Sequence, residues 1–191
     1  MVLIRTMFPN EMFRYREHLF RLSAEDRRLR FGNVVGDGVI DAYVDGIKPV
    51  RDRILVHMDG SLAVIGAVHI SASRRHATEL AFSVHKAARG AGLGTQLAER
   101  AILWSRNRGI RRVSICCLPE NRAMRRLTAR IGMAMTTEDG MCEGTLALAG
   151  ATPLSVLRET AQETAALADA AARWNARALG GFGLSALQPA A

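Results

Sequence analysis

A glycine-rich stretch near the middle of the chain has the residue types and spacing of an anion-binding loop. Glycines at alternate positions allow a tight turn and bring backbone N–H groups close to a ligand. Where a helix follows, its free N–H groups and the positive end of its dipole attract an anion. An arginine at the rim adds a positive charge. The stretch therefore predicts a site for a phosphorylated cofactor, and it consists of Arg89, Gly90, Ala91, Gly92, Leu93, Gly94 and Thr95.

The spacing of the glycines excludes two common nucleotide-binding loops. A Walker loop ends in Gly-Lys followed by Ser or Thr, and no such sequence follows Gly94. A dinucleotide loop carries a third glycine where this chain has Thr95, and it opens a long βαβ array. Here about half of the chain precedes the loop. Taken alone, the glycines are also compatible with a plain tight turn.

A second motif follows the loop after one helix-like and one strand-like segment. It begins at Asn121, which opens a helix-like run that ends at Gly132-Met133. Together with Arg89-x-x-Gly92-x-Gly94, this run resembles the motifs of the GNAT superfamily of N-acetyltransferases, over roughly residues 2 to 148. The resemblance implies a mixed α/β fold, in which the strands beside the loop helix splay apart and acyl-CoA occupies the wedge. The family often has a Tyr where this chain has Thr128.

The resemblance also implies an activity, which is transfer of an acetyl group from acetyl-CoA to a primary amine. The amine attacks directly in a ternary complex, and no metal takes part. The acceptor is a small molecule or a lysine or N-terminus of a protein, and the sequence does not identify it. Asn121 has a second interpretation as a helix cap alone. The residues expected to bind the cofactor are Ser83, Val84, Arg89, Gly90, Ala91, Gly92, Leu93, Gly94, Thr95 and Asn121.

Three side chains are candidates for catalysis. Strand alternation places Glu79 and His85 on one face of the strand before the loop. Glu79 is the candidate base for the acceptor ammonium, with a surface carboxylate paired to an arginine as the alternative. His85 is the second candidate because an unperturbed histidine has a pKa of about 6.5. Thr128 could hydrogen-bond the leaving sulfur, although a thiol leaves as thiolate with little help. Backbone N–H groups from Ser83 to His85 are expected to hold the carbonyl oxygen.

Hydrophobic periodicity predicts the elements that must position these residues. Asp59-Gly60 predicts a two-residue hairpin turn, and Ser23 is the predicted cap of the second helix. A short hairpin follows the second motif. The predicted helices cover residues 9–22, 39–47 and a segment beginning at Ser23, and a further helix follows the glycine loop. The predicted strands are residues 2–6, 54–58, 62–71, 78–84 and 112–118.

The composition changes near residue 150, which predicts three parts. Residues 1–149 form the acetyltransferase domain. Residues 150–179 form an alanine-rich helix, with Thr152 as its cap and Pro153 at its first position. This helix packs either on its own domain or on a second subunit, which would make a homodimer. Residues 180–191 form a glycine-rich, flexible tail.

Composition limits the classes of partner. The net charge is +8, but the basic residues are scattered, and aromatic residues make up 5% of the chain. A basic groove is expected for a polyanionic cofactor, so nucleic-acid binding is the weaker interpretation. No apolar run reaches the ~20 residues of a membrane helix. The first residues do not resemble a signal peptide, and a cytoplasmic location is expected. The three cysteines are expected to be reduced thiols rather than disulfide or zinc ligands.

Two other functions stay open at this stage. The first is a non-catalytic acyl-CoA-binding sensor of the same fold, for which Thr128 marks lost chemistry. The second is a basic protein associated with nucleic acid, whose binding would be sensitive to salt and independent of the glycine loop.

Overall fold

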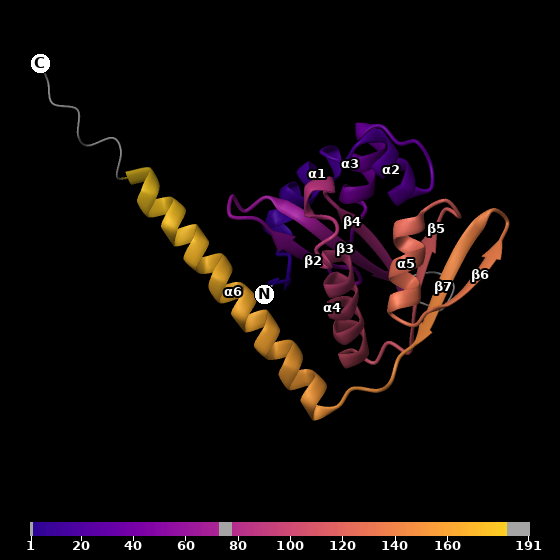
Figure 1. The fold of residues 1–191 in the computed structure, drawn as a ribbon. Helices are drawn as coiled ribbons and strands as arrows, with labels where there is room; N and C mark the ends of the chain where they lie inside the picture. The colour runs from indigo at the N-terminus through magenta and orange to yellow at the C-terminus, as the bar shows by residue number, and fades with distance from the viewer. Residues whose placement is uncertain (1, 73–77, 183–191) are drawn as a thin grey trace, which may run out of the picture.

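The computed structural model describes residues 2–72 and 78–182. Within these residues the chain forms a mixed α/β fold with a seven-stranded sheet in the order β1-β2-β3-β4-β5-β7-β6 (Figure 1). The pair β4 and β5 is parallel, and the other neighbouring strands are antiparallel. This is the mixed α/β sheet that the family resemblance implies.

The elements agree with the predicted order. A short 3-10 turn at Pro9–Glu11 precedes α1 and another at Lys86–Ala88 precedes α4. The first half contains β1 (Arg5–Thr6), α1 (Met12–Phe20), α2 (Ala24–Phe31), α3 (Asp37–Asp45), β2 (Arg53–Met58), β3 (Val64–Ala72) and β4 (Thr78–Val84). The second half contains α4 (Leu93–Asn107), β5 (Arg112–Cys117), α5 (Arg122–Arg130), β6 (Ala134–Glu138), β7 (Met141–Ala147) and α6 (Pro153–Phe182).

Two local predictions have clear outcomes. The hydroxyl of Ser23 accepts the N–H of Asp26 at 3.1 Å, so the predicted cap of α2 is confirmed. The hairpin between β2 and β3 is present, but the prediction of a two-residue turn at Asp59-Gly60 is wrong. Instead, the carboxylate of Asp59 accepts the N–H groups of Ser61 and Ala63, which stabilises a longer loop before β3 begins at Val64.

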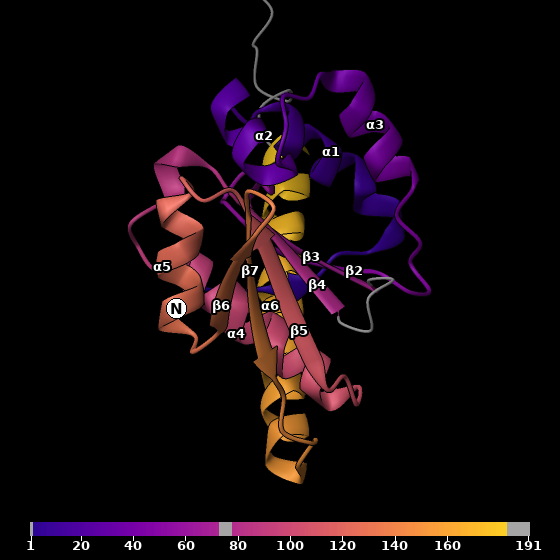
Figure 2. The same ribbon diagram turned by 90° about the vertical axis from the view of Figure 1, so that its right-hand side faces the viewer.

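The core has two clusters, one on each face of the sheet. On one face, α4 packs on β3, β4 and β5 through residues such as Leu80, Phe82 and Leu97. On the other face, α1 and α3 pack on β2 and β3. Both views place α1, α2 and α3 together at one end of the molecule (Figures 1 and 2). By contrast, no residue of α2 is fully buried, although Phe31 of this helix packs partly buried against the second cluster.

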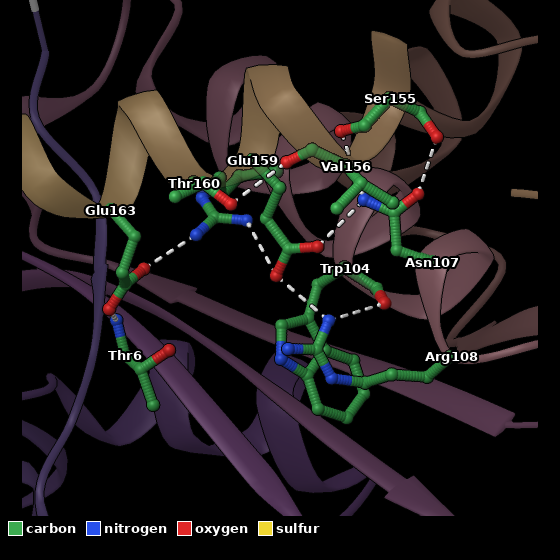
Figure 3. Close-up of polar contacts among 10 residues, drawn as sticks. Thr6, Trp104, Asn107, Arg108, Ser155, Val156, Glu159, Thr160 and Glu163 are labelled. Carbon is green, nitrogen blue, oxygen red and sulfur yellow. Dashed lines mark hydrogen bonds and ion pairs between the residues drawn. The ribbon is translucent and has the colours of Figure 1, made fainter. Parts of the chain in front are cut away.

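The C-terminal helix α6 runs along one side of the domain and packs on α4 and β1 (Figure 1). Thr152 caps its start by accepting the N–H of Ser155 at 3.2 Å. The buried guanidinium of Arg100 on α4 pairs with Glu163 at 2.5 Å and with Glu159 at 3.6 Å (Figure 3). Glu163 also accepts the N–H of Thr6 at 2.9 Å, so α6 is joined to both α4 and β1.

The helix α6 continues to Phe182, beyond the expected end at residue 179. The rest of the expected tail, residues 183–191, lies outside the described residues. None of the described helices combines the length and hydrophobicity that crossing a lipid bilayer requires.

Candidate active site

A cavity opens where β4 and β5 separate. The two strands pair only at Thr78–Val113 and Glu79–Ser114, and they diverge beyond Glu79. The space between them is a cavity of about 510 Å³. Its walls come from β4, from α2, from the start of α4, and from β5 and α5. This cavity is the wedge that the sequence resemblance implies.

The backbone of β4 presents unpaired groups to the wedge. The N–H of His85 donates to the carbonyl of Ile65 at 2.9 Å, in register with the pairing of β4 and β3. In an antiparallel pair, hydrogen-bonded residues alternate along the strand. It follows that Ser83 and His85 pair with β3, whereas the N–H groups of Phe82 and Val84 face the wedge. Of the expected group from Ser83 to His85, only the Val84 N–H is therefore directed to the cavity.

The glycine loop has the backbone geometry of an anion site. Gly90 and Gly92 adopt positive φ angles of 84° and 79°. The N–H of Gln96 donates to Gly92, which closes the first turn of α4. The N–H groups of the three preceding residues, Leu93, Gly94 and Thr95, have no carbonyl acceptor within the helix. A Cβ built on Gly94 would meet no atom within 4 Å, and Leu93, Gly94 and Thr95 all line the cavity.

Arg89 lies at the rim of the loop, but its charge is shared. Its guanidinium pairs with Asp26 on α2 at 2.8 Å and donates twice to the carbonyl of Val84, at 2.8 and 2.9 Å. The side chain thus connects the loop to α2 across the cavity. Ala91 does not line the cavity among the described residues, whereas Arg89, Gly90, Gly92, Leu93, Gly94 and Thr95 do.

Asn121 has the capping role that was the alternative interpretation, and it also lines the cavity. Its Oδ1 accepts the N–H of Met124 at 3.1 Å, which caps α5. Its Nδ2 donates to the carbonyl of Leu29 at 3.4 Å, so it also contacts α2. Two arginines of the same helix, Arg126 and Arg130, line the cavity. In the sequence they belong to a scattered set of basic residues, and only their separation of four residues indicates that they share one face of the helix.

Glu79 lies at the closed end of the wedge, at the last residue where β4 pairs with β5. Within the part of the chain that the structure describes, its carboxylate makes no hydrogen bond or ion pair. Its half-buried side chain is therefore available for proton transfer. The alternative, a carboxylate paired with one of the many arginines, is not what the described residues form.

His85 lies beside the site rather than in it. It is not among the described residues that line the cavity. Its ring packs edge-on against His18, with the ring centres 5.0 Å apart. Burial lowers the pKa of His85, and the charges of Arg21 and Arg89 lower it further. The structure does not bring its imidazole to the wedge.

Thr128 is fully buried under α5, away from the cavity. Its hydroxyl donates to the carbonyl of Arg125 at 2.9 Å and contacts the sulfur of Met135 at 2.8 Å. Because this hydroxyl already has a backbone acceptor and does not line the wedge, the structure does not place it to bond a leaving sulfur.

A buried histidine that the sequence analysis did not select contacts the site. His18 on α1 is completely buried, and its Nε2 lies 2.8 Å from the hydroxyl of Ser83. Its Nδ1 lies 2.9 Å from the carbonyl of Val64. A carbonyl only accepts, so Nδ1 carries the hydrogen and Nε2 accepts from Ser83. Burial lowers the pKa of His18 to about 4, and the ring is neutral at pH 7.

Cys117 is not suited to act as a nucleophile. In the described part of the chain the cysteines form no disulfide. Burial raises the pKa of Cys117 to about 11, so its thiol stays protonated at neutral pH.

Solved structures with the same fold include several acetyltransferases. The GNAT domain of S. lividans PAT is 22% identical, with a TM-score of 0.65 over 76% of this chain and 89% of that domain. Spermidine N-acetyltransferase from Vibrio cholerae, solved with CoA and spermine, is 14% identical, with a TM-score of 0.61 over 76% of this chain and 95% of that one. At these identities the likeness is one of fold.

A third structure is the phosphinothricin acetyltransferase of Sinorhizobium meliloti with AcCoA. It is 16% identical, with a TM-score of 0.58 over 80% of this chain and 91% of that one. The model of the Acetyltransferase (GNAT) family matches residues 14–133, which is more than half of the chain. The fold, the splayed strands and this match together show that the chain belongs to the GNAT family of acetyltransferases.

Proposed function

We propose that this protein transfers an acetyl group from acetyl-CoA to a primary amine, by direct attack in a ternary complex. The observation that carries the proposal is the wedge beyond Glu79, which ends at the free N–H groups of Leu93, Gly94 and Thr95. A diphosphate fits these N–H groups because they are unpaired and stand at the positive end of a long helix. Arg126 and Arg130 add positive charge to the same cavity.

The strand β4 offers the contacts that an acyl thioester needs. The wedge-facing N–H groups of Phe82 and Val84 are donors for the carbonyl oxygen, on which negative charge develops during attack. The pantetheine arm of acetyl-CoA carries amides, which suit the remaining unpaired groups of the strand. Asn121 would contact the same arm from the opposite wall.

Glu79 is the proposed base. An amine attacks only when it is neutral, so the acceptor ammonium must lose a proton first. The carboxylate of Glu79 has no partner among the described residues and stands at the closed end of the wedge. The neutral amine then forms a bond to the carbonyl carbon, the carbon–sulfur bond breaks, and the thiol leaves as thiolate. The excess proton on the nitrogen passes to that thiolate. No side-chain acid is assigned, because a thiol is acidic enough to leave without one.

The test is a panel of amines offered with acetyl-CoA and scored by release of free thiol. We expect release with at least one class of amine, and mass spectrometry of that acceptor should show one added acetyl group. A protein that binds acetyl-CoA but releases no thiol with any amine would instead be a sensor. Binding of DNA that coenzyme A does not compete would favour the nucleic-acid alternative.

A further inference from the structure

One arginine in the wall of the cavity has no counter-ion. Arg30, near the end of α2, lines the wedge on the side of α1 and α3. Among the described residues, no carboxylate lies within ion-pair distance of its guanidinium. Its Nε is buried and has no hydrogen-bond partner within the same residues. A charge without a partner is costly to withdraw from water, which makes this guanidinium a site for an anion.

Aromatic residues and a polar chain fix the position of this guanidinium. Arg30 donates to the hydroxyl of Tyr43 at 2.6 Å and packs over the rings of Phe31 and Tyr43. The Tyr43 hydroxyl in turn donates to Nδ1 of His69 at 2.5 Å. Burial raises the pKa of Tyr43 and lowers that of His69 to about 4, so both groups are neutral at pH 7. Neither neutralises the charge of Arg30.

Arg30 stands apart from the phosphate loop. Its support, His69, pairs directly with Ala81 on β4, three residues before the end of the strand at Val84. Three residues of strand span about 10 Å, and the glycine loop lies beyond that end. A diphosphate held at the loop would therefore leave Arg30 free for a different anion.

The same cavity contains an unpaired group of opposite charge. Glu79 and Arg30 both line the wedge, yet they do not form an ion pair with each other. Glu79 precedes Ala81 by two residues along β4, so Glu79 and the support of Arg30 lie near the same part of the strand. Two oppositely charged residues that line one cavity without pairing with each other match a ligand that carries an ammonium and a carboxylate.

We propose that the acceptor is an amino acid or a close relative, whose amine lies a few bonds from a carboxylate. This inference rests on the proposed acetyl transfer. Arg30 binds the carboxylate through its N–H groups, and Glu79 takes the proton of the ammonium. The amine nitrogen then bonds to the carbonyl carbon, the carbon–sulfur bond breaks, and the thiolate leaves with the electron pair. The excess proton on the nitrogen passes to that thiolate, which gives the amide and free thiol. Polyamines are poor acceptors, because Arg30 repels a second ammonium group.

The experiment compares amino acids with their carboxamides, which keep the amine and lose the negative charge. For each of the amino acids found in proteins, kcat/KM is measured by thiol release, once for the acid and once for its carboxamide. We expect the best acid to exceed its amide by about tenfold or more, as for a charge-assisted contact. The Arg30→Gln variant should reduce that ratio to near one, mainly through a higher KM for the acid.

A matched variant on the same helix controls for loss of charge. Arg28 is partly exposed, pairs with Glu25 and Glu120, and is not among the cavity residues. The Arg28→Gln variant should keep the preference for the acid. The Arg30→Lys variant retains the charge and should keep part of the preference for the acid. This variant serves as the test if Arg30→Gln does not fold.

The outcomes separate the two proposals. Equal rates for acids and amides, or a preference for polyamines, would overturn the inference about the acceptor and leave acetyl transfer intact. The inference would also be overturned if a folded Arg30→Gln or Arg30→Lys variant had the same acid-to-amide ratio of kcat/KM as wild type. Absence of thiol release with every amine would overturn the acetyl transfer itself.

Discussion

The hydroxyl of Ser83 and the ring of His18 form a hydrogen bond that joins β4 to α1 at the edge of the wedge. The donor is Ser83, because Nδ1 of His18 already donates to Val64. The hydroxyl hydrogen of Ser83 is therefore directed away from the cavity. Ser83 lines the cavity, so its oxygen can only accept from a ligand there. This contact sets the position of the strand that bears the wedge-facing N–H groups.

Stability should fall on mild acidification. Burial lowers the folded-state pKa of His18 and of His69 to about 4, below the unfolded value of about 6.5. Between these two pKa values the unfolded chain binds more protons than the folded chain. Each histidine therefore lowers the free energy of unfolding by up to about 1.4 kcal/mol for each pH unit of acidification. Urea denaturation at pH 7.0 and 5.0 measures the loss.

A control separates these histidines from the carboxylates. Although burial opposes it, hydrogen bonds from Arg5 and the Phe8 N–H hold the pKa of Glu11 below its ordinary value. The Glu11 carboxylate therefore stops contributing to the free energy of unfolding only at a lower pH than the histidines do. The His69→Gln variant should show a smaller loss between pH 7.0 and 5.0. An unchanged loss in this variant, or a flat profile in wild type, would contradict the assignment.

The ion pairs under α6 should contribute to stability. Replacing Glu163 by Gln removes the closest charge partner of the buried Arg100. We expect the free energy of unfolding to fall by about 2–4 kcal/mol, because a buried charge loses its pair. The control is Asp169→Asn, which breaks a partly exposed pair with Arg173 within α6 and should cost less than about 0.5 kcal/mol. Equal losses in the two variants would exclude an anchoring role for Glu163.

Thr128 should not take part in the reaction. The Thr128→Val variant keeps the shape of the buried side chain and removes the hydroxyl that donates to Arg125. We expect turnover within about twofold of wild type and a loss of roughly 1 kcal/mol in stability. Steady-state kinetics and urea denaturation give the two values. A hundredfold loss of turnover in a stable variant would restore Thr128 as a catalytic residue.

Glu79→Gln should lower turnover by about 10²- to 10⁴-fold, as for the loss of a general base. The acid limb that the carboxylate gives to the pH–rate profile should also disappear. The exposed Glu99 on α4 is the control, since Glu99→Gln changes charge by the same amount away from the cavity. Superimposable profiles for wild type and Glu79→Gln would remove Glu79 from the mechanism.

Short-range signals made the loop and the individual helices and strands predictable from the sequence, whereas the arrangement of the sheet came from the family resemblance. The positive φ angles at Gly90 and Gly92 are what alternate glycines permit, and the cap at Ser23 is a local hydrogen bond. The turn at Asp59 failed because the carboxylate of that residue bonds the next N–H groups and opens a longer loop. Local patterns do not reveal such competition between side chain and backbone.

The acceptor side of the site could not be predicted in the same way. His18 contacts Ser83 across 65 positions of sequence, and its spacing on α1 is that of an ordinary core residue. Arg30 appeared as one of many arginines, and only the fold shows that no carboxylate of the described residues reaches it. Thr128 was selected by analogy with the family, but its burial under α5 is a property of packing.

The central claim is that the amides after Gly92 hold the diphosphate of acyl-CoA, and calorimetric titration of two variants with acetyl-CoA tests it most directly. Gly92 and Gly109 have φ angles of 79° and 73°, so valine strains the backbone similarly at both, by about 1–2 kcal/mol. Gly109 lies between α4 and β5, outside the cavity. We expect saturable 1:1 binding by wild type and Gly109→Val, and loss of binding in Gly92→Val. Equal binding by all three proteins, or no heat with wild type, would contradict the account.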